Sequence, residues 1–189
     1  MELQGERLIP APIDKTWAAL NDPDTLKACI AGCESLERSG DDGFIALVAV
    51  KVGPVSARFK GNLKLTNVQA PTRYTINFDG QGGVAGFGKG SADVSLAPEG
   101  DKTRLSYSAQ AQVGGKMAQI GSRLIDAAAG KITDDFFTAF EAALQADASA
   151  AAGAAVPAPA PAPSAASRRA MWWIAAGVLI LVAFYFLRR

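Results

Sequence analysis

The sequence predicts an α+β domain in which a curved antiparallel sheet wraps around one long helix, followed by a C-terminal transmembrane helix. Apolar and polar residues alternate with a period of two through much of residues 44–113, which is typical of strands with one wet face. The apolar period changes to 3.6 over residues 117–140, as in an amphipathic helix. Residues 171–187 carry no charge at all, which favours a membrane span.

The N-terminal part is expected to form one strand and two short helices. The strand is residues 2–9, and the first helix follows Pro12. Asp22 and Pro23 form a start signal for the second helix, because an aspartate caps the free N–H groups and a proline fits the first turn. Gly32 is expected to end that helix.

The sheet is expected from alternating runs separated by turn residues. The clearest run covers residues 55–66, and shorter runs follow at 74–78 and 105–113. Glycine, proline and aspartate gather between the runs at residues 53–54, 70–72 and 98–101. Such short connections join strands as hairpins, so the sheet is antiparallel.

The long helix is expected to follow Gly114 and Gly115 and to run to about Gln145. Its apolar stripe consists of Met117, Ile120, Leu124, Ala128, Ile132, Phe136 and Phe140.

Small residues are frequent on the faces that the sheet and the helix would turn toward each other. On the sheet these are Ala57, Gly61, Ala92, Ala109 and Ala111, and on the helix Gly121, Ala127, Ala128, Ala129 and Gly130. Two arrangements satisfy this pattern. Either an internal cavity is left open, or the helix packs closer to the sheet.

The C-terminal part predicts a tether. Residues 146–169 are almost entirely alanine, proline, serine and glycine, a composition that builds no core and favours a disordered, partly extended linker. Residues 170–189 form the expected single-pass anchor, whose seventeen uncharged residues span ~25 Å as a helix. No signal peptide is expected at the N-terminus. We therefore expect domain 1–145 in the cytoplasm, attached to the cytoplasmic membrane.

The composition argues against several kinds of site. The chain has no histidine, and Cys29 and Cys33 are its only cysteines, so we expect no protein-held metal and no histidine-activated nucleophile. The cysteine spacing differs from a redox C-x-x-C pair, and two buried thiols are the expected state. Without a basic patch, no nucleic-acid partner is expected.

Residues 80–90 (GQGGVAGFGKG) contain two patterns found in nucleotide-binding loops. Both need a helix directly after the loop to hold phosphate, but the residues that follow alternate as a strand. We therefore expect a flexible hairpin or bulged strand with Phe87 near its tip, placed to gate a cavity mouth or to touch lipid.

Five stretches match one known family in order and spacing: residues 26–34 (LKACIAGCE), 51–61 (KVGPVSARFKG), 81–91 (QGGVAGFGKGS), 113–126 (VGGKMAQIGSRLID) and 135–137 (DFF). Together they resemble the CoxG-type family of carbon monoxide dehydrogenase subunits, which belongs to the START-like, or SRPBCC, superfamily. One departure is Ala31, which stands where the family pattern has a proline. The resemblance implies the helix-grip fold, with an apolar cavity between sheet and helix.

The resemblance also implies a role. Such a protein is a membrane-anchored accessory subunit without enzymatic activity and with no covalently bound cofactor. It recruits a molybdenum hydroxylase of the carbon monoxide dehydrogenase type to the membrane, and its cavity suits an isoprenoid quinone, menaquinone or ubiquinone, that passes electrons to the respiratory chain. Two alternatives stay open: a membrane-docking adaptor with a filled core and no ligand, and a START-like cyclase or hydrolase with Tyr107 or a carboxylate as acid.

The candidate ligand contacts are apolar residues on predicted inward faces or beside the glycine-rich loop, and ordinary core packing is the alternative for each of them. They are Phe59, Leu63, Phe78, Phe87, Tyr107, Met117, Ile120 and Leu124.

Overall fold

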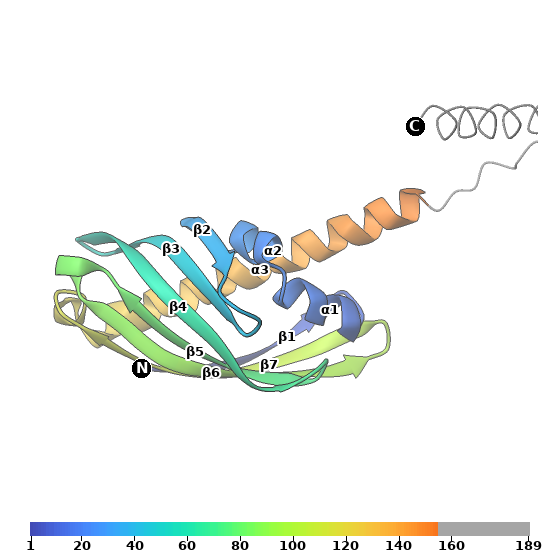
Figure 1. The fold of residues 1–189 in the computed structure, drawn as a ribbon, viewed down its shortest axis with the longest axis horizontal. Helices are drawn as coiled ribbons and strands as arrows, with labels where there is room; N and C mark the ends of the chain where they lie inside the picture. The colour runs from blue at the N-terminus through green and yellow to red at the C-terminus, as the bar shows by residue number, and fades with distance from the viewer. Residues whose placement is uncertain (155–189) are drawn as a thin grey trace, which may run out of the picture. The chain divides into compact units, whose positions relative to one another are not determined.

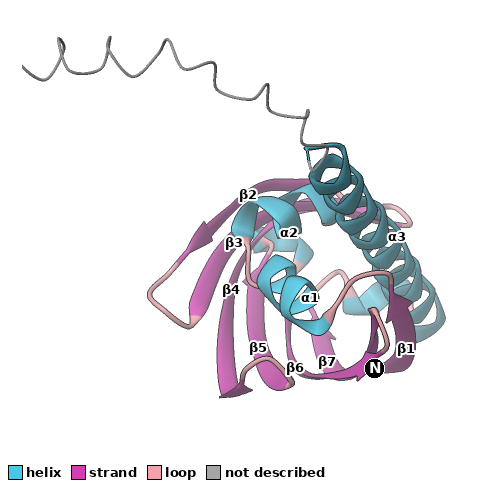
Figure 2. Cartoon of the chain, turned by 90° about the vertical axis from the view of Figure 1, so that its right-hand side faces the viewer, coloured by secondary structure: helices cyan, strands magenta, loops and turns pink. Residues whose placement is uncertain are grey.

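A curved antiparallel sheet and the long helix on its concave side dominate the fold (Figures 1 and 2). The computed structural model describes residues 1–154 of the chain. The elements in order are β1 (Glu2–Ile9), α1 (Ile13–Leu20), α2 (Pro23–Cys29), β2 (Cys33–Arg38), β3 (Gly43–Val52), β4 (Val55–Gln69), β5 (Arg73–Gln81), the 3₁₀ helix η1 (Gly83–Ala85), β6 (Phe87–Glu99), β7 (Lys102–Gly114), the 3₁₀ helix η2 (Ala118–Ile120) and α3 (Ser122–Ala154).

The strand order in the sheet is β1-β7-β6-β5-β4-β3-β2, with every neighbouring pair antiparallel. Strands β2 to β7 follow one another as hairpins, and the turn residues predicted those that join β3 to β7. β1 pairs with β7, so the first strand of the chain lies beside the last one. In Figure 2 the sheet bends into an open trough with the three α-helices on one side.

The antiparallel order places successive connections at alternate ends of the sheet. The β3–β4, β5–β6 and β7–α3 connections lie at one end, at the left of Figure 1. The β2–β3, β4–β5 and β6–β7 connections, with helix α1, lie at the other end. We call these the loop end and the α1 end.

Helix α2 begins where the sequence predicted. The Asp22 carboxylate accepts hydrogen bonds from the backbone N–H of Thr25 at 2.9 Å and from its hydroxyl at 2.6 Å. These bonds favour the charged carboxylate, so they lower the pKa of Asp22 below its ordinary value. The helix ends at Cys29, and Gly32 lies in the turn before β2 with φ +75°.

The packed part of the core lies toward the α1 end. Ile9, Leu105 and Phe140 are almost fully buried there. Trp17 meets Tyr74 edge to face with ring centroids 5.3 Å apart, and Phe136 stacks on Phe140 at 5.7 Å. Helix α3 therefore packs on the sheet through Phe137 and Phe140, which lie near its middle.

The long helix differs from the prediction at both ends. It begins at Ser122, because Gly121 has φ +99° and interrupts the right-handed helix, so Met117 and Ile120 precede it. It continues through Ala154 instead of ending near Gln145, since this stretch is rich in alanine, a strong helix former. Strand β2 was not predicted from the sequence, because it is short and follows α2 directly.

Within residues 1–154, no helix is both long enough and apolar enough to cross a membrane. The expected anchor at residues 170–189, and most of the expected linker, lie outside the described residues.

Candidate functional site

A cavity of about 430 Å³ lies between the sheet and the first half of α3. Its walls are mostly aliphatic and aromatic. They include Val48, Val50, Val52, Phe59, Leu63, Phe78, Phe87, Val113, Met117, Ile125, Ala128, Ala129 and Ile132. We call this space the main lobe.

A second lobe of about 330 Å³ extends toward the α1 end. It shares Ile30, Leu36, Leu63 and Ile132 with the main lobe. Tyr107 lines only the second lobe of the two. Each lobe falls in the ~300–1,000 Å³ range of small-molecule sites, and the two lobes adjoin at their shared walls.

The floor of the main lobe is made of glycine. Gly61, Gly80 and Gly88 are direct cross-strand neighbours on β4, β5 and β6, and all three line the lobe. A Cβ atom built on Gly88 would meet nothing within 4 Å, whereas one on Gly61 would lie 3.3 Å from the Asp79 carbonyl oxygen. The cavity is therefore open above Gly88 because three neighbouring strands supply no side chain there.

The side chains of α3 that face this floor are also small. Ala128 and Ala129 point at the main lobe between Ile125 and Ile132. The sequence left two arrangements open for these small residues, and the structure shows a hollow interior rather than a helix drawn close to the sheet.

The candidate contact residues divide into two groups. Phe59, Leu63, Phe78, Phe87 and Met117 line the main lobe, and Leu63 and Tyr107 line the second. Ile120 and Leu124 line neither lobe, and Leu124 is 54% exposed. The prediction for Leu124 assumed an unbroken helix from Met117. The break at Gly121 changes the helical phase, so Ile125 faces the cavity instead.

Sequence reasoning also missed the glycine floor as a feature of the site. Its signal was present, because glycines at inward positions of consecutive strands are unfavourable unless something needs the space. Recognising them as neighbours required the strand register.

Tyr107 lies on the inner face at the second lobe. Its ring stacks on Phe137 with centroids 5.4 Å apart. Gly5 makes room for it, since a Cβ there would lie 2.6 Å from the Tyr107 hydroxyl oxygen. Tyr74 lines the same lobe, and burial raises the pKa of its phenol well above the ordinary value. The Tyr74 phenol is therefore neutral at physiological pH.

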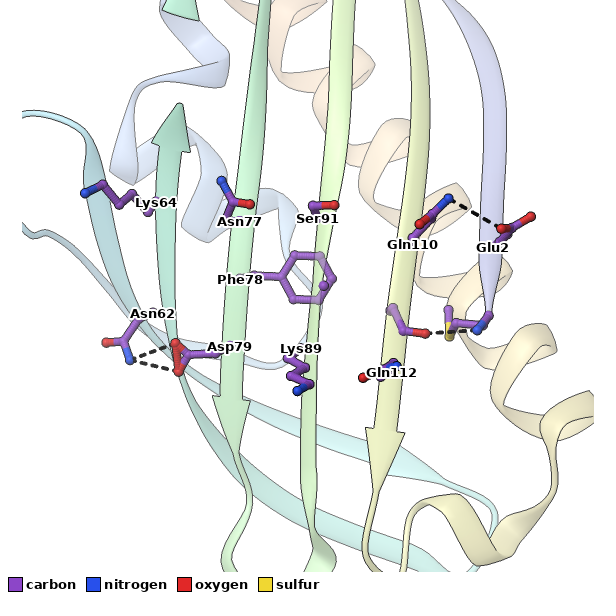
Figure 3. A pocket seen from close by; sticks show the side chains of 13 residues that line it. Glu2, Asn62, Lys64, Asn77, Phe78, Asp79, Lys89, Ser91, Gln110 and Gln112 are labelled. Carbon is purple, nitrogen blue, oxygen red and sulfur yellow. Dashed lines mark hydrogen bonds between the residues drawn. The ribbon is translucent and has the colours of Figure 1, made fainter. Parts of the chain in front are cut away.

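The outer face of the sheet carries a separate, open and polar hollow of about 860 Å³ (Figure 3). Its side chains bond to one another: the Asn62 amide donates to the Asp79 carboxylate at 3.2 Å, and the Gln110 amide donates to Glu2 at 3.4 Å. Lys64 and Lys89 also line it. We assign it to the solvated face of the sheet.

The two cysteines are free thiols in the structure. Cys29 is buried and Cys33 is half-buried, and burial raises the pKa of both thiols. Neither is a reactive thiolate at neutral pH. Among residues 1–154, no three His, Cys, Asp or Glu side chains come together as a metal site would require.

An antiparallel sheet that grips a C-terminal helix around an apolar cavity defines a START-like α+β protein. Solved structures support this class. A START superfamily protein from Mycobacterium smegmatis has a TM-score of 0.58 at 15% identity, covering 76% of this chain and 97% of that one. The ZhuI aromatase/cyclase from Streptomyces sp. R1128 has a TM-score of 0.55 at 13% identity, covering 77% of this chain and 93% of that one.

A conserved protein from Geobacillus kaustophilus is more similar, with a TM-score of 0.72 at 29% identity. The match covers 77% of this chain and 95% of that chain. A search of curated proteins found no match.

Residues 5–145 match the family model of the carbon monoxide dehydrogenase G-type subunit, CoxG. The chain therefore belongs to the CoxG family, as the sequence resemblance predicted.

Proposed function

We propose that this protein is a membrane-anchored accessory subunit that binds an isoprenoid quinone, menaquinone or ubiquinone, in its cavity. In this role it recruits a molybdenum hydroxylase of the carbon monoxide dehydrogenase type to the cytoplasmic membrane, where electrons pass to the respiratory chain. The observation that carries the proposal is the hollow apolar interior, with its glycine floor. The family's description, which names a subunit of carbon monoxide dehydrogenase, supports the partner.

The shape of the interior fits a flat ring with a slender prenyl chain. The main lobe is bounded on one side by the glycine floor and on the other by Ala128 and Ala129, so a slender prenyl chain can lie between sheet and helix. The second lobe continues the apolar surface toward Phe137 and takes the quinone ring. Apolar burial supplies the affinity, while a few polar groups orient the ligand.

Quinone carbonyl oxygens accept hydrogen bonds, and the second lobe offers donors. Among the described residues that line it, the polar side chains are Tyr74, Tyr107 and Thr133. A neutral phenol donates to a carbonyl. We propose that Tyr107 is the main donor because Gly5 and Phe137 fix its position on the inner face.

The expected anchor at residues 170–189 supports a role at the membrane. Tethering raises the local concentration of the domain near the bilayer without requiring a new contact. A quinone-binding domain held there can meet both the quinone pool and a soluble enzyme.

The two alternatives make different demands on the interior. An adaptor without a ligand needs no cavity, so the two lobes favour ligand binding over that function. A cyclase or hydrolase needs an acid or a base beside its substrate. The second lobe has no carboxylate among the described residues that line it, which leaves Tyr107 as the acid that such an enzyme would need there; we propose that this phenol orients a ligand and that the protein is not an enzyme.

The proposal is tested by purifying residues 1–154 from a quinone-containing bacterial host and analysing an organic extract by mass spectrometry. We expect close to one quinone per domain. Trp17 is the only tryptophan in this fragment and it packs on Tyr74, a wall of the second lobe, so quenching of its fluorescence reports added quinone. A clean extract combined with no quenching would leave the adaptor as the better function.

The partner is tested separately with the full-length chain. We expect it to bring a molybdenum hydroxylase of the carbon monoxide dehydrogenase type to vesicles of uncharged phosphatidylcholine alone, and a chain ending at residue 154 to leave that enzyme in solution with the same vesicles. Equal recovery of the enzyme with both chains would contradict the anchoring role.

A further inference from the structure

We propose that the loop end of the domain docks directly on an anionic lipid surface and so presents the cavity mouth to the membrane. The docking surface, here called the rim, consists of residues 51–56, 81–88 and 114–125. The inference deepens the proposed function and rests on it for the identity of the cavity's ligand, but docking itself needs no ligand.

The three segments of the rim form one continuous surface. The backbone N–H of Met117 donates to the Ala85 carbonyl at 2.9 Å, which ties the β7–α3 connection to η1. A Cβ on Gly53 would lie 3.7 Å from a methyl carbon of Ile120, so the β3–β4 turn adjoins the same connection. Connections far apart in the sequence are thus held together as a single face.

Large apolar side chains point out of this face. Val84 is 84% exposed, the highest value among the large exposed apolar residues of the described chain. Leu124 and Phe87 are exposed as well, at 54% and 38%. Phe87 also lines the main lobe, and a group of exposed apolar side chains beside an apolar cavity is typical of an interaction site rather than of an ordinary soluble surface.

The charge of the rim selects lipid headgroups as the partner. Lys51, Lys116 and Arg123 are exposed, and residues 51–56, 81–88 and 114–125 contain no acidic residue. Within the described part of the chain, none of these three cations forms an ion pair. Asp79 and Asp126 are the nearest acidic residues in the sequence, and Asp126 lies one helical turn from Arg123 on α3.

The α1 end has the opposite character. Its connections at residues 39–42, 70–73 and 99–102 contain four acidic residues, Asp41, Asp42, Glu99 and Asp101, against Arg73 and Lys102. Exposed apolar residues occur there too, including Val68 at 50%. The two ends therefore differ mainly in charge and in proximity to the cavity.

Docking by the rim joins the bilayer to the cavity. Phe87 and Met117 belong to the rim and also line the main lobe. Peripheral proteins bind anionic membranes through an apolar tip that enters the headgroup region and through cations around that tip. A lipid chain then passes from bilayer to cavity without crossing open water.

The test uses residues 1–154, which lack the expected anchor, and vesicles that contain no quinone. Flotation is compared on phosphatidylcholine alone and on phosphatidylcholine mixed with phosphatidylglycerol. We expect binding to the mixed vesicles, and about a fivefold loss for each of Lys116→Gln and Arg123→Gln on those vesicles only. Val84→Asp should weaken binding about tenfold, because it places a charge at the apolar tip. Val68→Asp is the matched control at the α1 end and should bind as the parent does.

Several results would overturn the proposal: no binding to either vesicle, equal loss for Val68→Asp and Val84→Asp, or a rim that binds the partner enzyme while ignoring lipid. The last result would make the rim a protein interface. The proposed function is judged independently by Trp17 quenching with a short-chain quinone in solution. Docking without quenching removes the quinone proposal alone, and quenching without docking removes the rim proposal alone.

Discussion

Replacing Gly88 with leucine tests directly whether the cavity is open and whether its glycine floor holds the ligand. A Cβ at this position meets nothing within 4 Å, and the backbone of Gly88 needs no positive φ. The leucine side chain therefore enters the main lobe without displacing a neighbour. The strand also loses a glycine, which is unfavourable in a strand interior.

The expected change in stability is positive. Burying a leucine side chain contributes ~1.5–3 kcal/mol. Replacing glycine at this second position of β6 contributes at most ~0.5–1 kcal/mol, which roughly offsets the ~0.5–1 kcal/mol of rotamer entropy that a buried leucine loses. The free energy of unfolding of ligand-free Gly88→Leu should thus rise by ~2 kcal/mol, which raises Tm by ~4–8 °C for a domain of this size.

The assay is urea unfolding of the delipidated fragment 1–154, together with quinone titration of Trp17 fluorescence. We expect quinone affinity to fall at least about tenfold, because ligand and leucine compete for one volume. Ser91→Leu is the matched control, since it adds the same side chain to the outer face of the same strand (Figure 3). It should change stability by less than ~0.5 kcal/mol and leave quinone binding intact.

The sign of the stability change shows whether the interior beside Gly88 is open or filled. In a filled interior, the same substitution overpacks the core and costs ~1–3 kcal/mol. Destabilisation of that size would refute the open cavity. Stabilisation with undiminished quinone affinity would refute the glycine floor as the binding surface.

Three further results are expected. Asp22→Ala should lower the free energy of unfolding by ~1 kcal/mol at neutral pH, because it removes the α2 cap. Since the folded carboxylate has a lowered pKa, this difference should be full above pH ~4 and vanish as the pH falls through the folded pKa. A difference in urea unfolding that does not change with pH would argue against the cap. The Cβ that Gly130→Ala adds meets no atom within 4 Å, so the substitution should stabilise α3 by ~1 kcal/mol and leave the quenching of Trp17 by quinone unchanged. A loss of quenching would place residue 130 in the site. Helix α3 (Ser122–Ala154) is ~50 Å long, and residues 155–170 reach at most ~54 Å. Deleting residues 157–164 shortens that reach to ~27 Å. The rim of the full chain in proteoliposomes should then no longer meet its own membrane, and the domain released by proteolysis should carry less quinone; an unchanged quinone content would contradict this geometry.

The sequence by itself determined the parts of the fold that local chemistry controls. Alternation along residues 55–66 became strand β4 because each side chain of a strand faces either the core or water. Asp22 became a cap because its carboxylate reaches an N–H only three residues away. The alternating residues after the glycine-rich loop form strand β6 and not the helix that a phosphate site needs. The five quoted stretches were enough to indicate the family.

The tertiary structure alone decided the site. The glycine floor exists because Gly61, Gly80 and Gly88 meet through the register of three strands. The positive φ of Gly121 shifted the phase of α3, which turned Leu124 outward and Ile125 toward the cavity. Whether small residues leave a cavity or draw a helix closer depends on where the rest of α3 packs, and Phe140 packs in a core with Ile9 and Leu105, which are far away in the sequence.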